Sequence, residues 1–175
     1  MGNVDCPTAQ SGSSCRALGG SMDGFISYAH DDWALVKTLK PTFDSIRLSG
    51  GPSFWNDQAL VGGDKWESKV LDAISRATYF VFLMSGNAIV SEFILTKEWP
   101  AMVEREERHG ALIVPVLLKN CLWKSRPEFS WRQVIPLHRA KPHPISKWTD
   151  RDTGVTEMGE QLLKSIADYK KYRAS

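Results

Sequence analysis

Residues 78–84 read TYFVFLM, and this nearly uninterrupted apolar run decides the fold class of the chain. A second run of the same kind, ALIVPVLL, occupies residues 111–118. A strand with one face in water alternates apolar and polar side chains, whereas a strand covered on both faces is apolar throughout. Both runs are therefore expected to be central strands of a parallel β-sheet with helices on each face.

Shorter strands and amphipathic helices surround these two runs. Apolar segments bounded by turn residues predict strands at residues 25–28, 53–55 and 134–137. A helical region is expected at residues 87–109, between the two central strands. Apolar residues three and four apart predict three further helices, whose buried faces consist of Trp33, Val36, Leu39, Phe43 and Ile46, of Trp66, Val70, Ile74 and Ala77, and of Val155, Met158, Leu162, Ile166 and Tyr169.

Alternation of strands and helices indicates right-handed crossovers between parallel strands. The predicted fold class is therefore α/β, a flavodoxin-like doubly wound sheet of five parallel strands in the order 2-1-3-4-5, with helices on both faces. In this order the winding reverses between strands 1 and 3, and ligands bind in the crevice at their carboxyl ends. The segments expected there are residues 28–32, residues 56–64 and the stretch that follows Met84.

Length and composition indicate one domain. A chain of 175 residues, 42% hydrophobic and 24% charged, has the composition of a globular protein and is long enough for a sizeable core. The domain is predicted to span residues 22–175. Residues 1–21 are rich in Ser and Gly and are interpreted as a flexible leader or as a segment added by cloning.

Charge, cysteines and hydropathy argue against several functional classes. The formal charge of +2 arises from mixed charges without a basic stripe, so nucleic acid is not expected as a partner. Cys6, Cys15 and Cys121 have neither metal-ligand nor disulfide spacing, and no metal site is predicted. The sequence has no signal peptide and no apolar run of the roughly 18 residues that span a bilayer. We therefore expect a cytoplasmic protein without a membrane partner.

Two other families with a similar sheet are excluded because residues that they require are missing from this sequence. A phospho-receiver domain needs an aspartate at the end of strand 3, but residues 83–87 read LMSGN. A Rossmann dehydrogenase needs a glycine-rich turn after strand 1, but residues 28–31 read YAHD. Phosphate-binding loops, zinc motifs and cysteine-nucleophile motifs are missing from the sequence as well.

Four stretches resemble one family in order and spacing. DGFISYAHDD at residues 23–32 resembles the first strand and following loop of Toll/interleukin-1 receptor (TIR) domains. WNDQALVGG at residues 55–63 resembles their BB loop, which is used in assembly and substrate access. SEFILTKEW at residues 91–99 is similar to the region of the catalytic glutamate, and residues 141–152 are similar to the C-terminal stretch of bacterial members. The chain therefore resembles a bacterial TIR domain of the NAD-cleaving type.

This resemblance implies an activity. In NAD-cleaving TIR domains the glutamate that matches Glu98 lies against the ribose that carries nicotinamide. Glu98 would orient the ribose hydroxyls and stabilise positive charge as the nicotinamide–ribose bond breaks. NAD+ would be a consumed substrate, with no resident cofactor, giving nicotinamide and either ADP-ribose or a cyclic ADP-ribose-type product. The resemblance also suggests a signal in antiphage immunity, with a downstream receptor for a cyclic product.

Glu98 must be ionised for that role, and the sequence offers a reason. Pro100 is best tolerated in the first turn of a helix, so a helix is predicted to begin near Thr96. Glu98 would then lie at the positive end of the helix dipole, which favours the charged form. Acids are also common in first turns for capping alone, so pattern by itself leaves a structural role for Glu98 open.

Further substrate contacts follow from the same resemblance. Catalytic members often carry Trp four residues before the glutamate, where this chain has Ile94, with Phe93 beside it. His30 is the basic residue of the nucleotide-contacting loop, or alternatively a plain helix-start residue. Asp57 would accept hydrogen bonds from the substrate or bind its own turn backbone. The predicted substrate-binding residues are Phe25, Ser27, Tyr28, Ala29, His30, Asp57, Leu60, Gly63, Phe93 and Ile94.

The rival function is a non-catalytic TIR module that acts by homotypic contacts. Both functions can coexist, because family members form head-to-tail assemblies in which a neighbour's BB loop completes the active site. Such heterologous contacts can grow into filaments. We therefore expect activity to depend on self-association. The predicted assembly residues of the BB loop are Asp57, Gln58, Ala59, Leu60, Val61 and Gly62.

Overall fold

The computed structural model describes residues 23–57 and 65–175. Its centre is a parallel sheet in the order β2-β1-β3-β4, formed by β1 (Gly24–Ser27), β2 (Phe54–Trp55), β3 (Tyr79–Met84) and β4 (Leu112–Leu117). The predicted α/β class, the parallel direction and the order of these four strands are confirmed. Since β1 lies between β2 and β3, the winding reverses at β1 and β3, as expected. The predicted leader lies outside the described residues.

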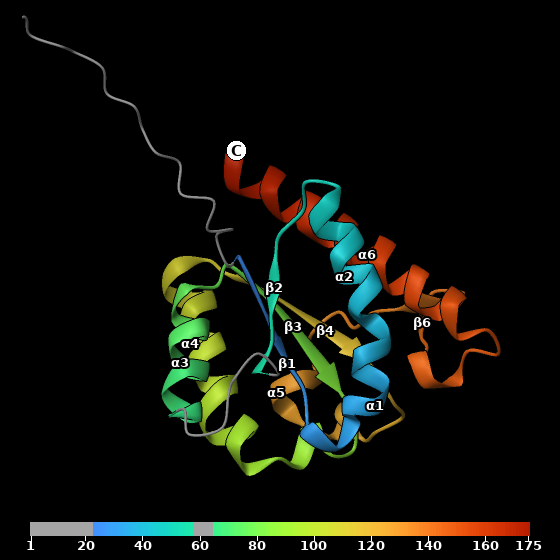
Figure 1. The fold of residues 1–175 in the computed structure, drawn as a ribbon, viewed down its shortest axis with the longest axis horizontal. Helices are drawn as coiled ribbons and strands as arrows, with labels where there is room; N and C mark the ends of the chain where they lie inside the picture. Colours follow the sequence, from blue (N-terminus) through green and yellow to red (C-terminus); the bar gives the residue numbers. More distant parts are fainter. Residues whose placement is uncertain (1–22, 58–64) are drawn as a thin grey trace, which may run out of the picture.

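Helices cover both faces of this sheet. Helices α3 (Trp66–Arg76) and α4 (Trp99–His109) lie on one face, while α1 (Trp33–Val36), α2 (Lys40–Leu48) and α6 (Arg151–Ala174) lie on the other (Figure 1). Helix α3 contacts α4, and α2 contacts α6. The short helix α5 (Pro127–Ser130) contributes Phe129 to the core on the α3–α4 side.

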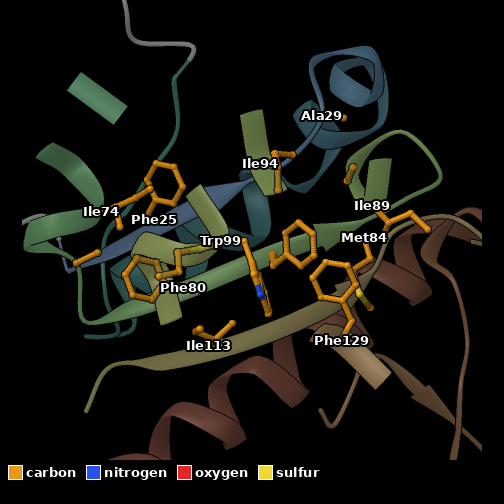
Figure 2. Packing of buried hydrophobic residues seen from close by; sticks show 14 of the residues in the cluster. Phe25, Ala29, Ile74, Phe80, Met84, Ile89, Ile94, Trp99, Ile113 and Phe129 are labelled. Atoms are coloured by element: carbon orange, nitrogen blue, oxygen red, sulfur yellow. The ribbon is translucent and has the colours of Figure 1, made fainter. Parts of the chain in front are cut away.

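The strands supply two separate cores because successive side chains point to opposite faces. On β3, Phe80 and Phe82 face the core of α3 and α4, whereas Val81 faces that of α2 and α6. Figure 2 shows the first core, in which Trp99 and Phe129 pack with ring centroids 4.7 Å apart. Neither face of β3 meets water, which explains the continuous apolar run that identified the strand.

The predicted fifth strand does not form as a regular strand. Of residues 134–137, Ile135 alone is bridged to β4, opposite Val116. Its N–H donates to the carbonyl of Pro115 at 3.0 Å, and its carbonyl accepts the Leu117 N–H at 2.7 Å. Pro136 follows, and it has no N–H with which to extend the ladder. The chain turns instead into a short antiparallel hairpin of β5 (Leu137–His138) and β6 (Lys141–Pro142). The prediction of five strands was therefore wrong by one strand within the described residues.

The first predicted helix is interrupted. It consists of the 3-10 turn η1 (His30–Asp32), α1, a second 3-10 turn η2 (Lys37–Leu39) and α2. Pro41 stands in the first turn of α2 and lacks the N–H that would continue the preceding helix, so the chain tightens into a 3-10 turn there. Of the predicted apolar face, Val36, Leu39, Phe43 and Ile46 are buried and Trp33 is half-buried. Leu35, which was not predicted, is buried beside them.

The helix that carries Glu98 begins earlier than predicted. After the 3-10 turn η4 (Ala88–Val90), the chain is helical from residue 92 through the π-helical segment η5 (Ile94–Glu98) into α4. Ser91 caps its start, accepting the Ile94 N–H at 3.4 Å. In the wider π turn the Trp99 N–H bonds the carbonyl of Ile94, and this turn accommodates Pro100 inside the helix. The predicted start near Thr96 was therefore wrong.

The remaining elements pack against one or the other of the two cores. The 3-10 turns η6 (Trp123–Ser125) and η7 (Ile145–Lys147) precede α5 and α6 respectively. Asp150 caps α6 by accepting the Asp152 N–H at 3.1 Å. The predicted inner face of α6 is buried at Val155, Met158, Leu162 and Ile166, and Tyr169 donates to the carbonyl of Gly110. Across residues 23–57 and 65–175, every helix is too short or too polar to traverse a lipid bilayer.

Candidate functional site

A cavity of 410 Å³ opens where the carboxyl ends of β1 and β3 part. The loop after β1, the start of α3, the segment after β3 and η5 form its walls. This is the crevice in which ligands of open α/β sheets bind. Its lining consists of Tyr28, Ala29, His30, Asp31, Trp66, Asn87, Val90, Ser91, Phe93, Ile94 and Glu98.

The carboxyl group of Glu98 belongs to this lining, yet the residue is only 6% exposed. Its Oε2 accepts a hydrogen bond from the Ser27 hydroxyl at 2.5 Å. In the part of the chain that the structure describes, no Lys, Arg or His forms an ion pair with it. Burial raises the pKa of Glu98 from 4.5 to about 7, while the Ser27 hydrogen bond lowers it, Asp57 raises it and His30 lowers it by smaller amounts.

This environment contradicts the prediction that a helix dipole keeps Glu98 ionised. The helix begins at residue 92, so Glu98 lies beyond the first turn, where the dipole has its effect. Burial dominates instead and favours the neutral acid. With a pKa of about 7, Glu98 is half ionised near neutral pH, so a modest change in its surroundings changes its charge.

Aromatic rings line the same cavity. Trp66, the first residue of α3, packs against Phe93 with ring centroids 4.3 Å apart. The His30 ring lies edge-on to Trp66, with ring centroids 5.8 Å apart. The centroids of the His30 and Tyr28 rings are 6.0 Å apart. Flat rings of this kind stack on planar ligands and attract cations. The cavity thus combines a buried acid with an aromatic surface.

Asp57 lies behind these rings, outside the lining. Its carboxylate accepts the Tyr28 hydroxyl at 2.7 Å and the Trp66 indole N–H at 3.2 Å, and it is bonded to Nε2 of His30. The Asp57 side chain is 10% exposed, whereas that of His30 is 59% exposed. One carboxylate therefore joins the end of β1, the turn η1 and the start of α3.

Comparison with known families identifies the domain. The family described as the TIR domain matches residues 25–150. The chain belongs to the TIR domain family. A protein of Sinorhizobium fredii (strain NBRC 101917 / NGR234), the uncharacterized protein y4lF, is 24% identical over 141 residues, which cover 81% of this chain and 42% of that protein. This TIR domain therefore spans less than half the length of that relative.

Solved structures of TIR domains have a similar fold. The chain is similar to the RPS4 and RRS1 TIR domain heterodimer, with a TM-score of 0.55 and 18% identity over 82% of this chain and 96% of that one. It is also similar to the TIR domain of the Toll-related receptor TRR-2 from Hydra magnipapillata, with a TM-score of 0.49 and 14% identity over 83% and 98% of the two chains. The first likeness supports the α/β fold of this TIR domain.

The cavity of this TIR domain brings together part of the predicted site. Tyr28, Ala29, His30, Phe93, Ile94 and Glu98 line it. Ser27 lies behind Glu98 and is 1% exposed, and Asp57 lies behind the aromatic wall. Phe25 is a core residue, because its position on β1 points toward α3, and it stacks on Trp55 at 5.6 Å. The predicted residues Gln58, Ala59, Leu60, Val61, Gly62 and Gly63 lie outside the described residues.

Sequence reasoning missed several lining residues, above all Trp66. Helical spacing assigned Trp66 to a buried face, but the residue opens α3 and lies at the cavity. A positional signal was present, because a helix that follows a parallel strand begins at the carboxyl edge of the sheet, where ligands bind. Asp31, Asn87, Val90 and Ser91 also line the cavity; they lie in segments expected at the crevice but were not named as site residues.

Asp32 forms a second polar cluster near the same edge. Its side chain is fully buried, and it pairs with Lys119 at 2.6 Å. It also accepts the hydroxyl of Ser85 and, at 3.4 Å, the amide of Asn87. The Ser85 oxygen in turn accepts the Ala88 N–H at 3.0 Å. The sequence indicated only a helix-start acid here, whereas the fold ties the segments after β1, β3 and β4 together.

A larger cavity, of 730 Å³, lies between the start of β4 and α6. None of the predicted site residues lines it, and Asp168, its one lining acid, is exposed. It lacks the buried carboxyl and the aromatic pair of the cavity at Glu98. Among residues 23–57 and 65–175, no group of three or more His, Cys, Asp or Glu is arranged to hold a metal ion.

Proposed function

We propose that this TIR domain cleaves NAD+ at the bond between nicotinamide and ribose. The observation that carries the proposal is the buried Glu98 carboxyl, which lines the switch-point cavity together with the aromatic pair of Trp66 and Phe93. The products are nicotinamide and either ADP-ribose or a cyclic ADP-ribose-type molecule. NAD+ is consumed as a substrate, and the reaction needs no resident cofactor.

The chemistry requires negative charge beside the ribose. As the bond between C1′ and the nicotinamide nitrogen breaks, its electron pair leaves with nicotinamide, and positive charge develops on the ribose ring. An ionised Glu98 stabilises this oxocarbenium-like centre. Water then adds at C1′ and releases a proton, giving ADP-ribose. Attack by a nucleophilic atom of the same molecule gives the cyclic product instead.

The raised pKa of Glu98 suits a cationic substrate. At neutral pH the carboxyl is about half ionised, with a pKa of about 7. The pyridinium ring of NAD+ carries a positive charge, and a nearby positive charge favours the ionised acid. Substrate binding therefore generates the charge that catalysis uses. Leaving nicotinamide is neutral, so its attraction to Glu98 disappears once the bond has broken.

The aromatic wall supplies a surface for the ring. Trp66 and Phe93 pack with their rings tilted by 41°, and a cationic ring gains from contact with Trp in particular. Ile94 is buried in the core at 2% exposure and adds an apolar contact at the cavity. Phe93 therefore takes the place of the Trp that many catalytic relatives carry at the position of Ile94.

Nicotinamide release from NAD+ by the purified protein tests this proposal. We expect the wild type to release nicotinamide and Glu98→Gln to be slower by roughly a hundredfold or more. Glu92→Gln is the matched control, since Glu92 is an exposed glutamate of the same helix. An inactive wild type at high protein concentration, or an active Glu98→Gln, would contradict the proposal. Chromatography of the products distinguishes ADP-ribose from a cyclic product.

A second candidate function is a non-catalytic TIR interaction module. The similar RPS4 and RRS1 TIR domains form a heterodimer, which favours TIR–TIR contact as a property of this chain too. We propose that this chain self-associates head to tail through residues 57–62 and that association raises its activity. A specific activity that stays constant over a wide dilution series would contradict that link. An antiphage signal, read by a receptor of a cyclic product, is the corresponding biological role.

A further inference from the structure

Three side chains of the cavity wall share one hydrogen-bond acceptor. Tyr28 binds Oδ1 of Asp57 at 2.7 Å, while Trp66 binds Oδ2 at 3.2 Å and His30 binds the same oxygen. The three donors come from the end of β1, from η1 and from α3, elements that no single stretch of sequence connects. Asp57 is thus the one described carboxylate that bridges all three.

This carboxylate is already engaged by the protein. An ionised carboxylate accepts about four hydrogen bonds, and three of the acceptor positions of Asp57 are in use. Its side chain is 10% exposed and it is not part of the cavity lining. A substrate would find at most one acceptor position unused, on a side chain that lies outside the cavity lining. The geometry therefore argues against a direct contact between Asp57 and substrate.

Building on the proposed NAD+ cleavage, we propose that Asp57 is the positioning residue of this site, which acts through Trp66 and His30 without touching the substrate. Its hydrogen bond orients the Trp66 indole so that the ring packs on Phe93 at 4.3 Å. Without that bond the indole gains rotational freedom at the mouth of the cavity. Displacements of about 1 Å in such positioning groups can reduce rates by roughly a hundredfold.

Asp57 also contributes to the electrostatics of Glu98, after burial and the Ser27 hydrogen bond. The charged groups around the Glu98 carboxyl are His30 and Asp31 from η1 and Asp57 behind Trp66. Lys97 of η5 and Glu67 of α3 pair with each other at 3.0 Å, with both side chains about half exposed. Asp57 raises the pKa of Glu98 and His30 lowers it. Removing the Asp57 charge therefore lowers the pKa of Glu98.

The first test requires no enzymatic activity. The indole N–H of Trp66 is assigned by nuclear magnetic resonance from the signal lost in Trp66→Phe, and its hydrogen exchange is measured in the wild type and in Asp57→Asn. We expect exchange at least roughly tenfold faster in Asp57→Asn, the equivalent of about one lost hydrogen bond. Asp72→Asn, an exposed aspartate on α3, is the matched control. The other tryptophan signals report whether each variant folds. Unchanged exchange at Trp66 in a folded Asp57→Asn protein would overturn the proposal.

The second test is a double-mutant cycle on NAD+ cleavage. We expect Asp57→Asn to lower kcat/KM by roughly tenfold to a hundredfold and to move the pH midpoint of the reaction downward. The loss in the double variant with Trp66→Phe should be smaller than the sum of the two single losses, since both changes break the same hydrogen bond. Additive losses with an unmoved pH midpoint would instead indicate direct substrate binding by Asp57. If the wild type lacks the activity, the exchange measurement still decides the positioning role.

Discussion

Two carboxyl groups are buried at the carboxyl edge of the sheet, and their surroundings are opposite. Asp32 has a lysine at 2.6 Å together with a hydroxyl and an amide as donors. Glu98 has one hydroxyl at 2.5 Å and no cationic partner among the described residues. A buried charge with full partners holds a fold together, whereas a buried acid with few partners is available for chemistry. The difference favours a structural role for Asp32 and is consistent with the catalytic role proposed for Glu98.

The largest effect expected from this comparison is on stability at the Asp32 cluster. Lys119→Met leaves the fully buried Asp32 carboxylate without its cation. Loss of one partner of a buried ion pair costs about 3 to 5 kcal/mol, and we expect the lower end because Lys119 is 42% exposed. Urea denaturation measures the loss. If Lys119→Met unfolds at the same urea concentration as the wild type, the ion pair between Asp32 and Lys119 does not stabilise the fold.

Glu98→Gln is expected to change stability in the opposite direction. A raised acid pKa means that the folded state binds the proton more tightly, so the wild type loses stability as pH rises from 4.5 to about 7. The neutral amide avoids this loss. We expect the variant to be more stable by up to about 3 kcal/mol at pH 8 and equal to the wild type near pH 4. Thermal unfolding at both pH values measures the difference, with Glu92→Gln as control. A variant less stable at pH 8 would contradict the burial argument.

The pH dependence of NAD+ cleavage is the next largest effect. The proposed reaction uses ionised Glu98, whose pKa is about 7. The rate at low substrate concentration should therefore rise about tenfold between pH 6 and pH 8 and level off above that. Initial rates across this range, at constant ionic strength, give the midpoint. A profile that is flat from pH 5 to pH 8 would mean that Glu98 does not carry the charge.

The smallest expected effect concerns the single hydrogen bond to Glu98. Ser27→Ala removes the hydroxyl that favours the ionised form, so the pKa of Glu98 should rise further. We expect the pH midpoint of cleavage to move upward and the rate at pH 7 to fall about threefold, in keeping with one hydrogen bond. The rate at pH 9 should change less than the rate at pH 7. Equal losses at both pH values would indicate a general packing defect at Ser27.

The sequence predicted most of the fold because its strongest signals are local. Continuous apolar runs located β3 and β4, and helical spacing located α3 and α6. The prediction of a fifth strand was wrong because Pro136 ends the ladder after one residue. The apolar pattern did not reveal this effect of the proline. The predicted helix start near Thr96 was wrong because Ser91 caps the helix earlier and a π turn accommodates Pro100 inside it. These two features outweighed the preference of proline for a first turn.

The candidate site was only partly predictable for a related reason. Resemblance named Glu98 and residues 28–30, which follow a recognisable strand. It did not indicate that Trp66 faces the cavity or that Asp32 binds Lys119, because each contact joins segments far apart in the chain. Asp57 was predicted as a substrate contact, and its three partners became apparent only in the fold.

The amino-acid sequence by itself determined the layered α/β architecture, since burial of apolar strands and helix faces follows from the order of side chains along the chain. It also determined which acid stands at position 98. The charge of that acid was decided only by tertiary structure, because desolvation depends on what the fold packs around a carboxyl group. The same holds for Asp57, whose role is set by donors that three separate elements bring to it.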